Sequence, residues 1–309
     1  MATVFMGTPE FARTVARAIH DTYPIDLVIT QPDKPVGRKK TMHSPPLKAF
    51  AEEHGIECMQ PRRIHDVLDD LERRTIDLII TAAYGQILPT RLLQMPALGA
   101  INVHASLLPK LRGGAPIQRA IERGYRETGV TIMYMSKKMD AGDIIAQRKI
   151  TISDDETSAS LFEKLAHLGG ELLKDTLPDI FNNKVMATPQ KTSEVTYAYT
   201  IKREEEMLDF TETAQTLERK IRAFYPSPAC YFTVNGEAVK VYGARIMEGS
   251  QETPGTVIAH AKTGPVIQCE RDALLIETIK PAGKKQMTAR DYLNGQGKAV
   301  LAVGKQVNT

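Results

Sequence analysis

The stretch TVFMGTPEFARTVARAIH, residues 3–20, decides how the chain begins to fold. Residues 3–7 form a short apolar run that is typical of a buried strand. Thr8 then offers a hydroxyl group suited to capping a helix, and Pro9 suits the first helical position because it has no N–H to donate. We therefore predict a strand over 3–7, followed at once by a helix that is capped by Thr8 and runs to about His20.

Similar apolar runs recur in the first half of the chain and alternate with amphipathic stretches. The β-branched runs at 25–30, 76–84 and 100–105 favour strands buried on both faces, and 129–135 with 143–150 form a later pair. A long helix is predicted from a cap at Thr157, with a bend or break at Pro178. Strands alternating with helices are typical of an α/β fold, so we predict a Rossmann-like, mostly parallel sheet in an N-terminal domain over 1–186.

The second half has a different pattern. Polar residues over 187–203 indicate a linker, and a helix is predicted over 211–226. Five short alternating strands follow, and Asn235-Gly236 between the first two is a strong hairpin signal. Several short strands with turn residues between them favour a small barrel. We predict an OB-like β-barrel domain over 204–309.

Composition restricts the class of protein. A chain of 309 residues suits two domains, and 42% hydrophobic with 25% charged residues is ordinary for a globular protein. The net charge of +3 does not by itself indicate a nucleic-acid binder. We expect a cytoplasmic protein, since the sequence shows neither a secretion signal nor an apolar run of roughly 18 residues, and nothing points to a membrane or an obligate protein partner. The three cysteines are far apart and the histidines scattered, so we expect reduced thiols and no metal site.

The segment INVHASLLPKLRGGAPIQ, residues 101–118, carries the most chemistry. Asn102 and His104 are two apart on a predicted strand, so their side chains share a face near its carboxyl end, where open α/β sheets bind ligands. Histidine exchanges protons near neutrality, and an asparagine amide can donate to a developing oxyanion. The following loop, 106–109, has two leucines suited to an apolar ligand wall.

Each of these residues also has an ordinary structural reading. His104 can be a histidine satisfied within the sheet, and Asp140 lies in MDAGDI, where Asp and Gly commonly form turns. The two leucines can belong to the core. Nicotinamide dinucleotide binding is not predicted, because GTPEFA at 7–12 lacks the second and third glycines of that fingerprint. Ser106 has no G-x-S-x-G surroundings and is not predicted to be a nucleophile.

Taken together, these residues resemble the folate-dependent formyltransferase family. An Asn-x-His pair, a Ser-Leu-Leu-Pro loop and a later Asp form the catalytic group of that family, and here they correspond to Asn102, His104, 106–109 and Asp140. The similarity extends over essentially the whole chain, and its last two segments resemble the branch that formylates tRNA. The matching segments are GTPEFA (7–12), QPDKPVGR (31–38), AYGQILP (83–89), IRAFYPSP (221–228) and KPAGKKQMTARDYLNG (280–295).

The resemblance implies a reaction and its substrates. The formyl donor would be 10-formyltetrahydrofolate and the acceptor the amino group of initiator methionyl-tRNA. Asn102 and His104 would stabilise the oxyanion, and Asp140 would orient His104 and help to remove the amine proton. The residues expected to contact the folate are Ile87, Leu88, Ser106, Leu107, Leu108 and Pro109.

Binding of tRNA requires positive charge beyond the catalytic group. The segment 33–48 reads as a Gly/Pro-containing loop with several basic residues, among them Lys34 and Lys48. Arginine suits bidentate phosphate contacts best. The alternative reading of these charges is a solvated surface. The residues expected to contact tRNA are Arg38, Lys39, Lys40, Lys202, Lys284 and Lys285.

Two other functions fit parts of the sequence. A formyltransferase acting on an amino-sugar nucleotide would share Asn102, His104 and Asp140. A non-catalytic RNA-binding module would need only the barrel, and the presence of all three catalytic residue types argues against it.

Overall fold

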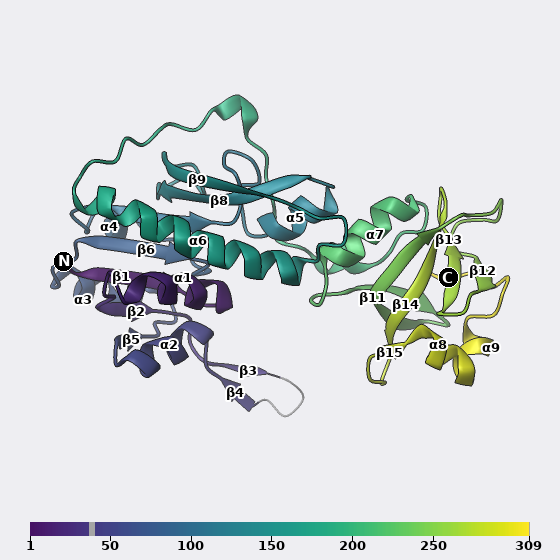
Figure 1. Cartoon of the computed structure of the whole chain (residues 1–309). Coiled ribbons are helices and arrows are strands. Elements are labelled where there is room, and N and C mark those ends of the chain that lie inside the picture. The colour runs from purple at the N-terminus through teal and green to yellow at the C-terminus, as the bar shows by residue number, and fades with distance from the viewer. Residues whose placement is uncertain (37–40, 309) are drawn as a thin grey trace. The chain divides into compact units, whose positions relative to one another are not determined.

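The computed structural model describes residues 1–36 and 41–308, and the chain divides into two compact units. The first unit comprises residues 1–116, 127–151 and 162–199. The second comprises 117–126, 152–161 and the chain from Thr200 onward. Figure 1 follows the path of the chain through its elements. The boundaries at 186 and 203 remain an interpretation of the sequence.

A mixed sheet forms the centre of the first unit. Its order is β5-β2-β1-β6-β7-β8-β9; the first five strands run parallel, and β8 and β9 are antiparallel to their neighbours. The α/β class with a mostly parallel sheet is thus confirmed. The strands are β1 (Thr3–Gly7), β2 (Leu27–Ile29), β5 (Glu57–Met59), β6 (Leu78–Ala82), β7 (Ala100–His104), β8 (Glu127–Tyr134) and β9 (Ile144–Thr151).

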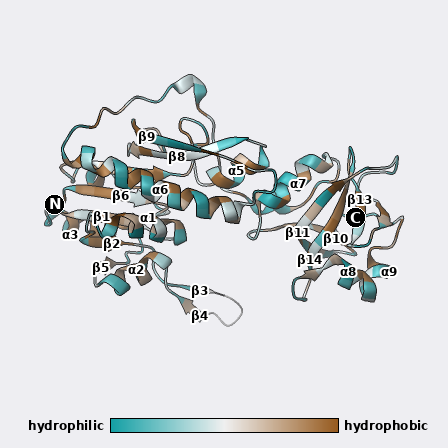
Figure 2. Ribbon diagram, in the orientation of Figure 1, coloured by the Kyte–Doolittle hydropathy of each residue, from teal (hydrophilic) through white to brown (hydrophobic). Residues whose placement is uncertain are grey.

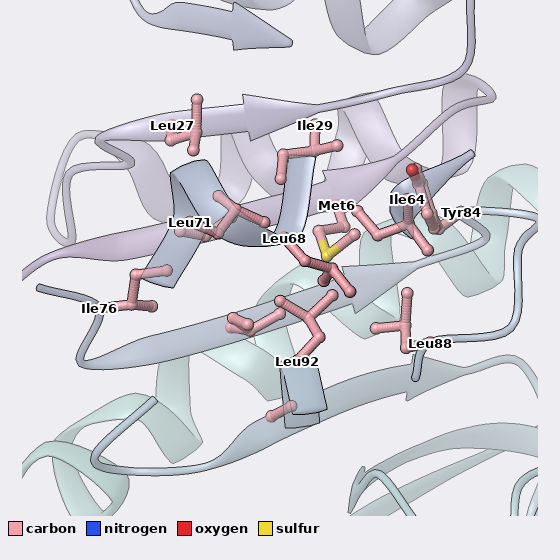
Figure 3. Close-up of a cluster of buried hydrophobic side chains, with 13 residues drawn as sticks. Met6, Leu27, Ile29, Ile64, Leu68, Leu71, Ile76, Tyr84, Leu88 and Leu92 are labelled. Carbon is pink, nitrogen blue, oxygen red and sulfur yellow. The ribbon is translucent and has the colours of Figure 1, made fainter. Parts of the chain in front are cut away.

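One face of the sheet buries a large apolar cluster against short helices (Figure 3). Val4 and Met6 belong to this cluster while Phe5 between them does not, as expected from the two-residue period of a strand. The covering helices contribute Leu68, Leu71 and Leu92. The helices on this side are η1 (Ile64–Val67), α3 (Leu68–Glu72) and α4 (Thr90–Leu93).

Two adjacent glycines let the longest helix approach its neighbours closely. A Cβ atom at Gly169 would lie 3.0 Å from Val103 Cγ1, and one at Gly170 would lie 2.5 Å from the Cβ of Ala18. This helix, α6, alternates hydrophobic and hydrophilic residues along its length (Figure 2), which suits one buried and one solvated side. The remaining helices before residue 200 are α1 (Glu10–His20), α2 (Pro46–His54), α5 (Pro116–Glu122), α6 (Ser158–Phe181) and η2 (Thr192–Glu194).

Two details of the predicted helices were wrong. Thr8 does not cap α1; its hydroxyl donates instead to the carbonyl of Tyr84 at 3.1 Å, and Pro9 occupies the cap position. Pro178 does not end α6, because the helix continues past it to Phe181. A proline in the last turn removes a single backbone hydrogen bond there, and the helix tolerates the loss.

The segment predicted as a loop over 33–48 contains regular structure. β3 (Lys34–Val36) and β4 (Thr41–His43) pair as an antiparallel ribbon, and α2 starts at Pro46. Lys48 does not offer a free charge, because its Nζ lies 2.9 Å from Asp33 Oδ2. Hydrogen bonds from Gln60 and Lys48 hold the pKa of Asp33 below its usual range.

The second unit contains an antiparallel, barrel-like sheet with the order β10-β11-β14-β13-β12, and β15 pairs with β14. The predicted hairpin is present: Asn235 and Gly236 both have positive φ and join β10 to β11. The strands are β10 (Cys230–Val234), β11 (Glu237–Met247), β12 (Val257–His260), β13 (Pro265–Gln268), β14 (Ala273–Pro281) and β15 (Met287–Thr288).

Helical segments precede and follow this sheet. α7 is shorter than predicted, and the Thr213 hydroxyl caps it by accepting from the N–H of Thr216. The short strand β15 and the helices after it were not predicted. These segments are η3 (Arg203–Glu206), α7 (Ala214–Ala223), α8 (Ala289–Tyr292), η4 (Leu293–Gly297) and α9 (Lys298–Val300).

Three general features of the described residues bear on function. None of the helices in 1–36 and 41–308 is long and apolar enough to cross a membrane. Over the same residues, no three His, Cys, Asp or Glu side chains are grouped as metal ligands would be. Cys58, Cys230 and Cys269 are free thiols, and burial raises the pKa of Cys230 and of Cys269 to about 12.

Candidate active site

His104 and Asp140 meet at the carboxyl end of β7. His104 is the last residue of that strand and is buried, and its Nε2 lies 3.1 Å from the carbonyl oxygen of Leu111. Because a carbonyl can only accept, Nε2 carries a proton, and Nδ1 is the nitrogen that faces the carboxylate. Nδ1 lies 3.8 Å from Asp140 Oδ2. The ring can therefore exchange a proton on the side where the carboxylate lies.

Asp140 is held in an unusual backbone conformation. Its φ is +50°, in the left-handed region that Asp tolerates better than most residues. Its Oδ2 accepts a 2.8 Å hydrogen bond from the N–H of Gly113. That glycine lies so close to Ala198 that a Cβ atom would be 2.6 Å from the Ala198 carbonyl oxygen. Asp140 is thus oriented by a neighbouring loop as well as by its own turn.

Asn102 lies two residues before His104 on β7 and is half-buried. Thr81 lies opposite Asn102 on β6, and its hydroxyl donates to Asn102 Oδ1 at 2.8 Å. The same hydroxyl lies 3.1 Å from the carbonyl oxygen of Ile101. The structure places Oδ1 of Asn102 toward Thr81, so the two N–H groups of Nδ2 point the other way. No hydrogen bond found within 1–36 and 41–308 uses those N–H groups, which leaves two donors for an incoming oxygen atom.

The loop 106–109 is fixed by the strand behind it. The buried hydroxyl of Thr131 donates to the carbonyl of Ser106 at 2.7 Å and accepts from the N–H of Leu108 at 3.1 Å. Gln147 Nε2 donates to the Leu108 carbonyl at 2.8 Å. Ser106 is fully buried and its own hydroxyl donates to the Lys110 carbonyl, so it shapes the loop from inside. Leu107 and Pro109 remain partly exposed, whereas Leu108 is buried.

We expect Thr131→Val to destabilise the protein by about 1–3 kcal/mol, because it leaves the Leu108 N–H and the Ser106 carbonyl buried without a partner. Folate binding should weaken with it. Thr128→Val is the matched control, since Thr128 lies on the same strand and its buried hydroxyl has no partner among the described residues. Urea unfolding and folate titration of both variants provide the measurement; equal behaviour of the two would contradict a role for Thr131.

The loop 83–89 lies at the carboxyl end of the neighbouring strand, β6. The Tyr84 carbonyl accepts from Thr8 Oγ1 and from Gln31 Nε2, which ties the loop to the ends of β1 and β2. The Tyr84 ring is part of the buried cluster in Figure 3, and burial raises the pKa of Tyr84 to about 12. Ile87 is 88% exposed, while Leu88 is buried in the cluster that contains Tyr84.

Several residues that shape the site were not identified from the sequence. Thr81 and Thr131 lie inside strands, where a buried threonine has no distinguishing signal. Gln190 contacts both Arg112 and the turn of Asp140. Arg112 lies three residues after the 106–109 loop, so its position was a usable clue. Nothing in the sequence distinguished Gln190.

The expected tRNA-binding residues occupy several parts of the chain. Arg38, Lys39 and Lys40 lie outside the described residues. Lys202 is exposed in the second unit, with its Nζ 3.8 Å from Glu204 Oε1. Lys284 and Lys285 follow β14 and are exposed, and Lys284 Nζ lies 5.6 Å from the centre of the Tyr292 ring.

Comparison with known proteins assigns both halves of the chain to related families. Residues 1–177 match the Formyl transferase family, and residues 200–297 match Formyl transferase, C-terminal domain. A protein of Lysinibacillus sphaericus named Methionyl-tRNA formyltransferase is 47% identical over 308 residues, which cover 98% of each chain. A protein of the same name from Listeria monocytogenes is 44% identical and covers 96% of each chain.

Solved structures share the fold at lower identity. The N-formyltransferase of Helicobacter canadensis, in complex with folinic acid and dTDP-3-aminofucose, is 18% identical with a TM-score of 0.68 over 89% of this chain and 99% of that one. HypX of Aquifex aeolicus, in complex with tetrahydrofolic acid, is 19% identical with a TM-score of 0.65, and the match covers 98% of this chain and 48% of HypX. On the family matches and the near full-length relatives, the chain belongs to the formyl transferase family.

Proposed function

We propose that the chain transfers the formyl group of 10-formyltetrahydrofolate to the amino group of initiator methionyl-tRNA, giving N-formylmethionyl-tRNA. The observation that carries this function is the 47% identity, over 98% of both chains, to a relative named for that activity. The match of residues 200–297 to the C-terminal formyl transferase domain supports it. Translation initiation takes place in the cytoplasm, where we place the enzyme.

The two amide donors of Asn102 supply the first requirement of the reaction. When the amine nitrogen bonds to the formyl carbon, negative charge develops on the formyl oxygen. Donors aimed in advance at that position stabilise the charge without having to reorganise during the reaction. Thr81 keeps Nδ2 of Asn102 pointing in one direction by donating to Oδ1. His104 lies on the same face of β7, and its Nδ1, which also faces Asp140, is the proposed second donor when it carries a proton.

Asp140 and His104 supply the second requirement, removal of a proton from the amine. The amine nitrogen must lose a proton as its bond to the formyl carbon forms, and the folate nitrogen must regain one as its own bond to that carbon breaks. The His104 ring can receive and return a proton through Nδ1, which faces Asp140 Oδ2. We propose that the carboxylate takes the amine proton directly or through water, that the Asp140–His104 pair returns a proton to the folate nitrogen as it leaves, and that no bond forms between substrate and enzyme.

The surroundings of this group fit an aromatic donor molecule. Ile87 exposes most of its apolar surface, and Leu107 and Pro109 expose part of theirs. Exposed apolar side chains at the carboxyl edge of an open sheet are typical of a ligand wall. Leu88 and Leu108 are buried, so we propose that they support the wall from behind, as Ser106 does. The pterin ring would lie against this surface, with the formyl group toward Asn102.

Charge reversal tests the proposed phosphate contacts of the basic segment. We expect replacement of Arg38, Lys39 and Lys40 by Glu to raise the KM for methionyl-tRNA at least about tenfold. The salt dependence of this KM should also become shallower, because binding with fewer phosphate contacts releases fewer counterions. Binding of the folate should not change. The measurement is the KM for tRNA at several salt concentrations.

A control of equal charge separates specific contacts from long-range attraction. Lys164, Lys174 and Lys184 are exposed on and just beyond α6, and changing them to Glu alters the net charge by the same amount. If both triple variants raise the KM equally, the basic segment acts only through the overall charge. The tRNA contacts should then be sought at Lys202, Lys284 and Lys285.

A second candidate function has one observation in its favour. The Helicobacter canadensis enzyme of the same fold was crystallised with an amino-sugar nucleotide. The decisive experiment supplies the purified protein with labelled 10-formyltetrahydrofolate and either charged initiator tRNA or an amino-sugar nucleotide. We expect label on the methionyl-tRNA alone; transfer to the sugar nucleotide alone would overturn the proposed acceptor.

A further inference from the structure

The side chain of Gln190 bridges the turn of Asp140 and the buried Arg112. Its Nε2 donates to the carbonyl of Asp140 at 2.9 Å and to the carbonyl of Gly142 at 2.7 Å. Its Oε1 accepts from Arg112 Nε at 3.1 Å and from Arg112 Nη2 at 2.7 Å. Both N–H groups of the amide thus donate to the two ends of one short turn.

Arg112 determines which way this amide points. A guanidinium group only donates, so Oε1 must face Arg112 and Nε2 must face the two carbonyls. Arg112 itself is 8% exposed, and no carboxylate in the described part of the chain pairs with it. Its backbone is bonded on both sides, since its N–H donates to the Thr196 carbonyl and its carbonyl accepts from the N–H of Ala198. Arg112 is therefore a rigid support.

The segment around Gln190 is itself bonded to the same turn. Thr188 and Ile144 exchange two backbone hydrogen bonds of 2.8 Å, and Ile144 is the first residue of β9 after the turn. The Thr196 hydroxyl accepts from the N–H of Leu111. Most of the segment interpreted as a linker, residues 188–198, therefore connects the loop after His104 with the turn of Asp140.

The turn needs such support because its other side faces solvent. Residues 136–139 are exposed, and Asp140 has a positive φ that the chain adopts only under constraint. Its carboxylate must nevertheless stay between the N–H of Gly113 and the ring of His104. A shift of about 1 Å in a catalytic group can lower a rate about a hundredfold.

We propose that Gln190 is a positioning residue for the formyl transfer: its two N–H groups hold the carbonyls of Asp140 and Gly142, and thereby keep the Asp140 carboxylate beside His104. This inference rests on the proposed function, in which Asp140 takes part in proton transfer. It assigns a residue of the 187–203 segment a role that acts through Asp140.

Gln190→Glu isolates the two donated hydrogen bonds. The new carboxylate still accepts from Arg112 but cannot donate to either carbonyl. We expect the single-turnover rate to fall at least about tenfold, with the KM for tRNA and the affinity for folate within about twofold of the wild type. Gln190→Met removes the donors without adding charge and should be slowed similarly. Asp143→Asn, in the same turn and exposed, is the control and should keep the full rate.

Combining these changes with Asp140→Asn shows whether Gln190 acts through Asp140. If it does, Gln190→Glu should lower the single-turnover rate less than about twofold in the Asp140→Asn background, because the effects of residues that act as a unit are not additive. A full additional loss in the double variant, or full rates in both Gln190 variants, would overturn the inference. If Asp140→Asn keeps the wild-type rate, Asp140 has no part in the mechanism. That result would refute the proposed proton transfer rather than the positioning role of Gln190 alone.

Discussion

Asp140→Asn is expected to lower the single-turnover rate of formyl transfer at least about a hundredfold while the protein stays folded and binds folate normally. The amide oxygen can still accept from the N–H of Gly113, so the turn keeps its anchor. What is lost is the negative charge that faces His104 Nδ1 at 3.8 Å. Without it, the amine proton has no charged acceptor beside the ring.

The experiment compares the rate at saturating substrates with the affinity for the folate, measured by calorimetry. Asp143→Asn again serves as the control, because it makes the same chemical change on an exposed residue three positions away. A near wild-type rate for Asp140→Asn would show that proton removal follows another route. A large loss of folate affinity would instead point to a binding role for Asp140.

Asn102→Asp is expected to reduce the rate at least about 10²–10³-fold, since losing an oxyanion donor usually costs that much and the new carboxylate adds repulsion. The replacement keeps the shape of the side chain and an oxygen for the Thr81 hydroxyl, so the contact between β6 and β7 survives. It exchanges the Nδ2 donors for an oxygen that repels the developing charge. Asn102→Ala should be slowed less, since it lacks that repulsion.

Thr81→Val is the companion variant for this measurement. It removes the hydrogen bond that orients the Asn102 amide but leaves both donors in place, so we expect a smaller loss than in either Asn102 variant. If Asn102→Asp and Asn102→Ala both retain full single-turnover rates, the oxyanion is stabilised by His104 or by other groups.

The strands that are buried in the core could be predicted from the sequence. β1 and β6 are mainly apolar runs, and β7 is apolar except for Asn102 and His104; burial on both faces of the sheet favours such runs. β3, β4 and β15 are two or three residues long, and β4 is fully exposed. Strands this short are defined by the partner they pair with, so they leave no periodic signal. The helix cap predicted at Thr8 was wrong because of a tertiary contact as well: the fold brings the Tyr84 carbonyl within hydrogen-bonding distance of the Thr8 hydroxyl.

The basic segment shows how a charge count can mislead. Lys34, Lys48 and their neighbours read as one cluster of positive charge, but Lys48 is paired with Asp33 at the base of the β3–β4 ribbon. The sequence contains both residues, yet their pairing depends on where α2 starts. Charge available to a ligand is a property of the folded surface.

The sequence by itself determined the parallel sheet, the antiparallel second half, and the placement of Asn102 and His104 on one face of β7. These features follow from local rules: the apolar runs, the Asn-Gly turn and the two-residue period of a strand. Only the tertiary structure decided that Asp140 Oδ2 lies 3.8 Å from His104 Nδ1, and that Gln190 supports the turn from 50 residues away. Such contacts join segments with no shared periodicity, and their geometry is set by how the loops at the carboxyl edge of the sheet pack together.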